Sequence, residues 1–211
     1  MDIKNRSLIL DFWEKVFNIL SCISIFRIIR LLKKQMSYRF VELWVILNVV
    51  LSFVSSIFVF YTEISCNWVF YPFMFYGALR IFEIIIYQIN VLLFDPYRSS
   101  KQGIVYKIKS PTRLVVLLFH NYFEIICWFS VILIAFLNMN NNLSFTWGEY
   151  LKLNFFYITT FNTDGIIEIY KNISGGASFV LFESIVGYII TLVTMARFIG
   201  LLPPTESIDD V

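Results

Sequence analysis

The chain has little charge for its length, and few glycine, proline and cysteine residues. Charged residues make up only 15% of its 211 positions, against about 25% in ordinary soluble domains, whereas 58% of the positions are hydrophobic. A soluble domain of this size needs more polar surface, and a disordered chain needs low hydrophobicity, so this composition excludes both classes. We therefore expect an all-α, helical membrane protein.

The scarcity of cysteine and histidine limits the chemistry that the chain can support. Cys22, Cys66 and Cys127 are too few and too scattered for a disulfide framework or a cysteine-based zinc site, and His120 is the single histidine. The sequence has no Gly-rich phosphate loop, and the net charge of +2 gives no basis for binding nucleic acid. We expect no catalytic residues, no metal site and no cofactor.

Four apolar runs are long enough to cross a bilayer, which needs about 20 residues of helix. The runs lie at about 42–61, 69–94, 114–137 and 177–201. Because a backbone in lipid must satisfy its own hydrogen bonds, we expect four transmembrane helices. Basic residues gather before the first run and between the second and third, so the positive-inside rule predicts cytoplasmic N- and C-termini in a cell (inner) membrane.

The pattern of apolar and basic residues in 1–40 predicts an amphipathic helix that lies in the cytoplasmic membrane interface. Their apolar stretch, VFNILSCISIF, is too short to span comfortably, and basic residues follow it at helical spacing. The alternative is a fifth span from about Ser7 to Phe26, which would bring Glu14 and Lys15 into hydrocarbon. The cytoplasmic basic surface is predicted to comprise Arg27, Arg30, Lys33, Lys34, Arg98, Lys101, Lys107 and Lys109.

Two charged residues lie near the expected midplane of the membrane. Arg80 is about 11 residues into the second span from the outside, and Glu124 is about 11 residues into the third from the inside. At 1.5 Å per residue both lie about 16 Å deep, where a charge is costly and normally has a partner. We expect Arg80 to contact Glu124, Glu83 or both as a structural pair, with gating or proton relay as the functional alternative.

Two residues of the fourth span lie near the level expected for the loop that precedes it. Glu183 is expected to brace this loop from behind, to form a hydrogen bond with Thr159 or Tyr157, or simply to pack within the helix bundle. Gly187 permits close helix packing or a hinge.

Residues 138–176, between the third and fourth spans, are typical of a re-entrant loop. A polar stretch, NMNNNLSF, precedes the short helical pattern WGEYLKLNFFYITTF, and the polar turn NTDG follows it. Irregular backbone at membrane depth is tolerated only where it is buried in protein or lines water. Such a loop therefore points to a pore.

The run FFYITTFNTDGI at 155–166 resembles the potassium-channel pore motif, in which an aromatic pore helix ends in T-T-V-G-Y-G-D and an apolar residue. Thr159 and Thr160 match the paired threonines, and Ile166 matches the apolar residue. The stretches Glu183-Ser-Ile-Val-Gly187 and Ala196-Arg197-Phe198 resemble the inner helix of bacterial channels with two membrane helices per pore. Asn121-Tyr122-Phe123-Glu124 and Trp128-Phe129 resemble the outer helix, so the resemblance covers about residues 112–202.

The resemblance implies a homo-tetramer with a pore and filter at Thr159, Thr160, Phe161, Asn162, Thr163 and Asp164. Asn162 and Asp164 replace the two filter glycines, and Thr163 replaces the aromatic residue. Asn and Asp best tolerate the left-handed conformation among non-glycine residues, so a turn can still form. Rings of their side-chain oxygens would attract monovalent cations, which predicts a cation-permeable pore with poor potassium selectivity.

The expected organisation has four parts: an interfacial helix at 1–40, two peripheral spans with a basic loop at 41–111, a channel-like pore module at 112–202 and an acidic cytoplasmic tail at 203–211. The alternative function is a non-conducting membrane sensor or anchor that recruits a cytosolic protein through the basic surface, as in a bacterial antiviral defence system. A transporter is a third hypothesis, which the lack of an inverted repeat disfavours.

Overall fold

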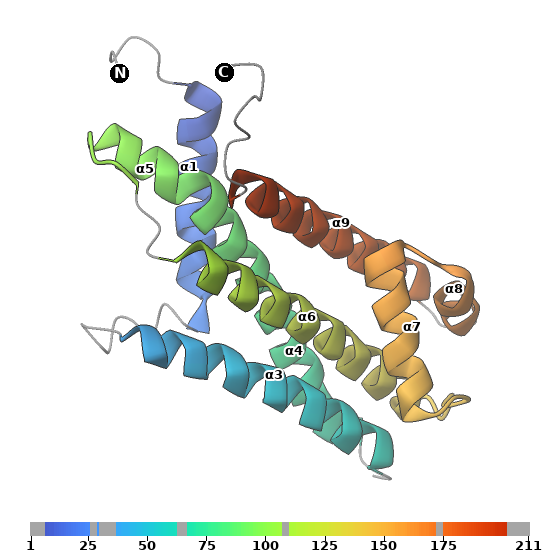
Figure 1. Cartoon of the computed structure of the whole chain (residues 1–211). Coiled ribbons are helices and arrows are strands. Elements are labelled where there is room, and N and C mark those ends of the chain that lie inside the picture. The colour runs from blue at the N-terminus through green and yellow to red at the C-terminus, as the bar shows by residue number, and fades with distance from the viewer. Residues whose placement is uncertain are drawn as a thin grey trace, which may run out of the picture.

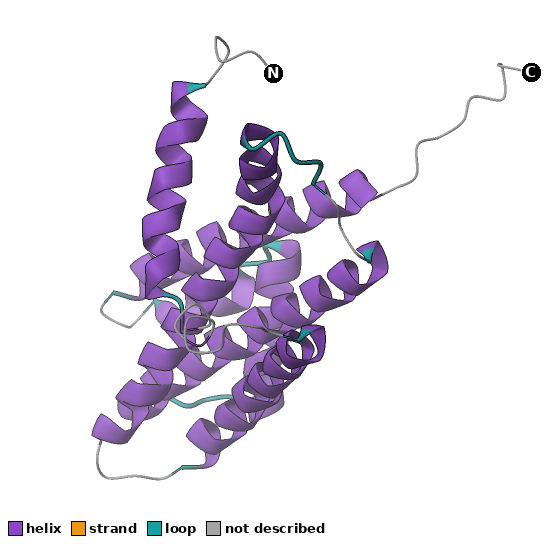
Figure 2. Ribbon diagram, turned by 90° about the vertical axis from the view of Figure 1, so that its left-hand side faces the viewer, coloured by secondary structure: helices purple, strands orange, loops and turns teal. Residues whose placement is uncertain are grey.

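The computed structural model is helical throughout the residues that it describes, which are 7–25, 29, 37–62, 67–106, 110–171 and 175–201. Helices joined by short loops account for all regular elements in these ranges, and none of these residues forms a strand (Figure 2). The predicted all-α fold is confirmed.

Four helices are long and apolar enough to cross a membrane, as the sequence predicts. They are α3 (Tyr38–Tyr61), α4 (Phe70–Ile89), α6 (Pro111–Met139) and α9 (Gly176–Leu201). The boundaries of three of them lie within a few residues of the predicted spans. The exception is α4, which is part of a continuous helical stretch of 35 residues.

The helical stretch around α4 continues past the predicted end of the second span at residue 94. A short 3-10 turn, η3 (Asn67–Val69), precedes it, and a π-helical turn, η4 (Asn90–Phe94), connects it to α5 (Asp95–Lys101). Pro96 would break a regular α-helix by clashing with the carbonyl of the preceding turn. The wider π turn lies at that position, so the helix passes the proline and the charges beyond it.

The spans lie side by side with α6 near the centre (Figure 1). Helix α6 packs against α3, α4, α7 and α9. In its most apolar stretch 72% of the residues are buried, against 28% for α9, so α6 is the core helix and α9 lies at an edge. The largest buried side chains of α6 are Ile125, Ile126, Trp128, Phe129, Leu133, Ile134 and Leu137.

Helix α1 (Leu8–Leu20), followed by the short turn η2 (Ser21–Ile23), lies beside α5 and runs obliquely to the spans (Figures 1 and 2). With 13 residues it is about 20 Å long, shorter than the roughly 30 Å of hydrocarbon. The amphipathic pattern is present, because acidic residues face α5 while Leu8, Ile9, Phe12, Trp13 and Ile19 are exposed. Its location in the membrane interface stays a prediction.

Two short helices, α7 (Trp147–Thr160) and α8 (Asp164–Tyr170), connect α6 to α9 at one end of the bundle (Figure 1). The start of α7 is fixed by a capping box, in which Thr146 donates its backbone N–H and its hydroxyl to Glu149 over 2.7 and 2.9 Å. Helix α7 packs against α6 and α9. The short helix expected between the third and fourth spans is therefore present.

Candidate functional site

The expected ion pair forms between α4 and α6 in the middle of the bundle. Arg80 donates from Nε to Glu124 Oε1 over 2.9 Å and from an η nitrogen to Oε2 over 3.1 Å. Its other η nitrogen donates to Glu83, three residues later on α4. Arg80 is 3% exposed and Glu124 is fully buried, so the prediction that Arg80 contacts one or both acids is confirmed.

The contact between α4 and α6 is close because Gly77 has no side chain. A Cβ at Gly77 would lie 3.0 Å from the Trp128 ring. Trp128 also donates its indole N–H to Glu124 over 3.2 Å, and its ring meets Tyr76 edge-on. The glycine thus allows a bulky residue to fill the core and to orient the acid that binds Arg80.

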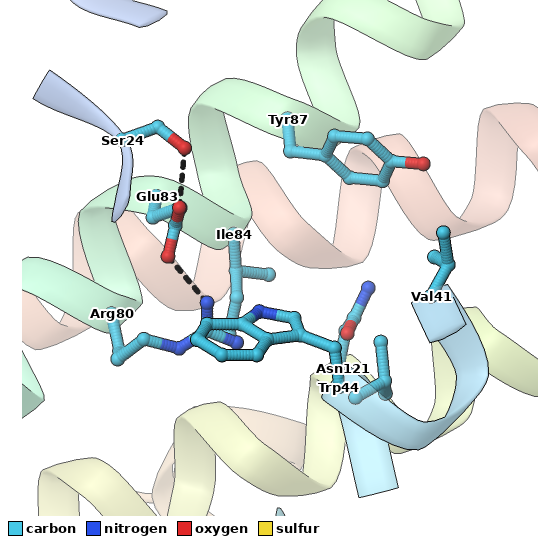
Figure 3. A pocket seen from close by; sticks show the side chains of 9 residues that line it. Ser24, Val41, Trp44, Arg80, Glu83, Ile84, Tyr87 and Asn121 are labelled. Carbon is cyan, nitrogen blue, oxygen red and sulfur yellow. Dashed lines mark hydrogen bonds and ion pairs between the residues drawn. The ribbon is translucent and has the colours of Figure 1, made fainter. Parts of the chain in front are cut away.

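A cavity of about 50 Å³ lies beside Arg80 and Glu83, between α3, α4, α6 and the N-terminal segment (Figure 3). Ser24 reaches this site from the N-terminal segment and donates its hydroxyl to Glu83. The Trp44 ring of α3 lies 5.8 Å from the Arg80 guanidinium carbon. The cavity has room for water next to these polar groups. The arrangement is a buried polar network that joins separate helices.

The predicted filter segment forms a tight turn between two helices. Thr160 ends α7 and Asp164 begins α8, so only Phe161, Asn162 and Thr163 lie between the two helices. The left-handed residue is Phe161, at φ 55° and ψ 27°, and neither Asn162 nor Asp164 adopts a positive φ. A turn thus forms at the expected place, and its left-handed residue is Phe161 and not one of the two residues that replace the filter glycines.

The polar side chains of the turn make mainly local hydrogen bonds. Thr159 and Thr160 each donate a hydroxyl over 2.6 Å to the carbonyl four residues earlier in α7. Asn162 accepts from the Asp164 N–H over 3.1 Å, and both residues are exposed. These contacts stabilise the helix end and the turn, and leave the Asn162 and Asp164 side chains at the surface of this single chain.

Phe161 takes the left-handed conformation because its ring packs on α9. It stacks on Tyr188 with ring centroids 4.1 Å apart and planes 11° apart. A Cβ at Gly187 would lie 3.4 Å from the Phe161 ring and 3.6 Å from the Ile158 carbonyl oxygen. Stacking of about 0.5–1.5 kcal/mol offsets the roughly 1–2 kcal/mol that αL costs. The close packing expected at Gly187 is confirmed.

The end of α7 lies beside the middle of the neighbouring spans. Gly187, against Ile158 and Phe161, is about 16 Å along α9 from its first residue at 1.5 Å per residue. Tyr122, near the middle of α6, donates its hydroxyl to the Ile158 carbonyl over 3.2 Å and lies 3.3 Å from the Thr191 hydroxyl.

Both outer ends of the α7–α8 segment lie at the end of the bundle. The Trp147 indole donates to Ser56 over 3.0 Å, near the last turn of α3. Tyr170 packs on Phe179 with ring centroids 5.1 Å apart, in the first turn of α9. The chain between Trp147 and Tyr170 therefore runs from the ends of the spans to their middle and back.

Glu183 lies behind α7 and makes none of the hydrogen bonds expected of it. It is fully buried, and neither carboxyl oxygen has a hydrogen-bond partner. Tyr157 donates its hydroxyl to the Val180 carbonyl over 2.8 Å and contacts Ser184 instead. Of the alternatives for Glu183, a hydrogen bond from Thr159 or Tyr157 is wrong, because both hydroxyls find nearer partners. Packing within the helix bundle is confirmed.

Two residues of the predicted basic surface are engaged by α1. Lys101 lies 2.8 Å from Asp11 and 2.9 Å from Glu14, and Arg98 contacts Asp95 at 2.9 Å and Glu14 at 3.4 Å. Asp11 and Glu14 lie three residues apart, a spacing that places both acids on one face of a helix and could have indicated this contact from the sequence. The remaining residues lie outside the described ranges: Arg27, Arg30, Lys33, Lys34, Lys107 and Lys109.

The hydroxyls of Tyr122 and Tyr157 join α6, α7 and α9. The sequence carries no signal for this role, because aromatic residues are too common in this chain for two tyrosines to stand out. Across the described ranges, His, Cys, Asp and Glu do not gather in groups of three that could hold a metal.

No protein-family model matches the chain, and neither a curated protein nor a solved structure does.

Proposed function

We propose that α6, α7, α8 and α9 form a pore-loop unit, and that the protein is a channel-like integral membrane protein of the cell (inner) membrane. The observation that carries this proposal is the depth of α7. Its last turn contacts the middle of α6 and α9, while its first residue bonds near the end of α3. A short helix that enters to mid-depth and a turn that leads back are the parts of a re-entrant loop.

The chemistry of the turn favours cations. The C-terminal end of α7 carries a partial negative charge, and the exposed Asn162 and Asp164 follow it directly. One chain contributes one turn, so a closed pore requires several copies, and the resemblance to potassium channels implies four. A ring of four Asp164 carboxylates would attract monovalent cations and repel anions. The three-residue turn, which has no glycine, supports poor potassium selectivity.

Flux through liposomes that contain the purified full-length chain tests this function. We expect a cation flux that Asp164→Asn makes less selective for cations over anions. Glu168→Gln is the matched control, because Glu168 is an exposed acid on α8 that lies outside the turn. Absence of any flux, together with wild-type behaviour of Asp164→Asn in cells, would refute the channel.

One observation favours the second candidate, a non-conducting membrane sensor or anchor that recruits a cytosolic protein. The hydroxyls of Thr159 and Thr160 bond within α7, and the chain between α7 and α8 is not extended. A potassium filter instead presents a row of backbone carbonyls to the ion. For this candidate we expect liposomes with no flux and a cellular activity that charge reversal in the cytoplasmic basic residues abolishes.

A further inference from the structure

Glu183 stands out among the buried acids of the described residues because it has neither a charged partner nor a hydrogen bond. Both of its oxygens are enclosed without a partner, and no described charge acts on them. Glu124 is buried to the same extent, yet it accepts from Arg80 twice and from the Trp128 indole. Glu124 is therefore a buried acid with hydrogen-bond donors around it, whereas Glu183 is a buried acid with none.

An ionised carboxylate in an apolar interior costs several kcal/mol unless a cation or hydrogen-bond donors compensate it. Glu183 has neither, and binding one proton removes the charge. We infer that Glu183 is a proton-binding site, occupied at neutral pH, so that the side chain is the uncharged carboxylic acid.

The groups that face Glu183 from neighbouring helices support this assignment. Glu183 lies close enough to Tyr157 of α7 and Tyr170 of α8 to act electrostatically on both phenols, and the Tyr170 hydroxyl is also buried without a partner. From α6, Phe129 packs on the rings of Phe179 and Phe182, just before Glu183 on α9. These neighbours are phenols and apolar rings.

The nearest cation on the same helix is remote from this site. Arg197 is 14 positions further along α9, about 21 Å away, where it donates to the Gln88 carbonyl of α4. Tyr188, one turn beyond Glu183, is stacked on Phe161. The surroundings therefore favour the neutral form of the acid.

The position of Glu183 links its protonation to the packing of α7 against α9. One turn on either side are the two contacts that hold α7 against α9: Tyr157 with Val180 and Ser184, and Phe161 with Gly187. Loss of the proton places a charge between these contacts and weakens them. The proton thus keeps the turn packed against α9, and this role does not depend on whether the protein conducts ions.

Infrared spectroscopy of the full-length chain in lipid nanodiscs tests the site. We expect a C=O stretching band of a protonated carboxylic acid at pH 7 that Glu183→Gln removes and the surface control Glu168→Gln retains. If wild type and Glu183→Gln have the same acid bands, Glu183 is ionised and the inference fails. A carboxylate band that shifts when sodium replaces potassium identifies a metal cation in place of the proton and also overturns it.

Thermal unfolding provides a second measurement. Because the folded state holds a proton that the unfolded state releases, wild-type stability should fall as pH rises above the ordinary pKa of a glutamate, and Glu183→Gln should show a smaller fall. Glu183→Met, which is also uncharged and of similar length, should fold and behave in the same way. If both neutral variants fail to fold, the fold needs the charge of Glu183 and the proposal is wrong.

Discussion

Removing Arg80 should destabilise the protein more than removing its main partner. In Arg80→Met, Glu124 keeps only the Trp128 indole as a donor, and an uncompensated buried acid costs about 3–5 kcal/mol. In Glu124→Gln, Arg80 keeps its contact with Glu83, so the loss is that of charge-assisted hydrogen bonds, about 1.5–3 kcal/mol. The double variant should be more stable than Arg80→Met alone, because Glu124 no longer adds a second buried carboxylate beside Glu83 after the loss of Arg80.

The free energy of unfolding of all four proteins in mixed SDS and detergent micelles measures this asymmetry. Arg113→Met is the matched control, since the Arg113–Glu42 pair is partly exposed and exposed pairs contribute about 0–1 kcal/mol. Equal stability of Arg80→Met and the double variant, or equal losses in the two single variants, would refute the role assigned to the buried pair.

Three further predictions concern other contacts. Gly77→Val should lower the unfolding free energy by about 1–3 kcal/mol, because its side chain meets the Trp128 ring, and Gly77→Ala should have a smaller effect in the same titration. Hydrogen bonds from the Thr146 N–H and hydroxyl hold the pKa of Glu149 below its usual range, so their stabilisation is complete above the ordinary pKa of a glutamate and is lost as pH falls through the lowered one. Hydrogen exchange at the start of α7 should speed up on acidification in wild type and be less dependent on pH in Glu149→Gln. Lys101→Glu should repel the acids of α1 and release that helix, which limited proteolysis should detect as faster cleavage within α1, whereas unchanged cleavage would contradict the docking.

The sequence predicted the spans well because the membrane imposes a simple length and composition on each one. The same reasoning paired Arg80 with its acids, since two opposite charges at similar depth in a membrane have few other partners available. It did not predict that the helix continues beyond residue 94, where the second span was expected to end. The π turn before Pro96 lets the helix continue, and hydropathy carries no signal for such a turn.

The turn after α7 lies where the sequence places it, but the sequence does not identify its left-handed residue. Residue type alone favours Asn162 or Asp164 for a positive φ, whereas the structure assigns it to Phe161. The reason is a contact between residues that are distant in sequence, the stacking of Phe161 on Tyr188 over Gly187. The conformational preferences of single residue types cannot predict such a contact. Glu183 is a similar case: its depth was correct, but the partners expected for it bond elsewhere.

The Arg80 cluster also has a consequence for the order in which the chain is built into the membrane. Arg80 and Glu83 lie one turn apart on α4, so this segment can leave the insertion machinery with its positive charge already matched. Glu124 follows 44 residues later on α6 and meets an arginine that is already in the bilayer. A segment with a central charge costs about 2.5–3.5 kcal/mol to insert alone. During biosynthesis we therefore expect the charges of α4 to favour insertion of α6, the helix around which the finished bundle is packed.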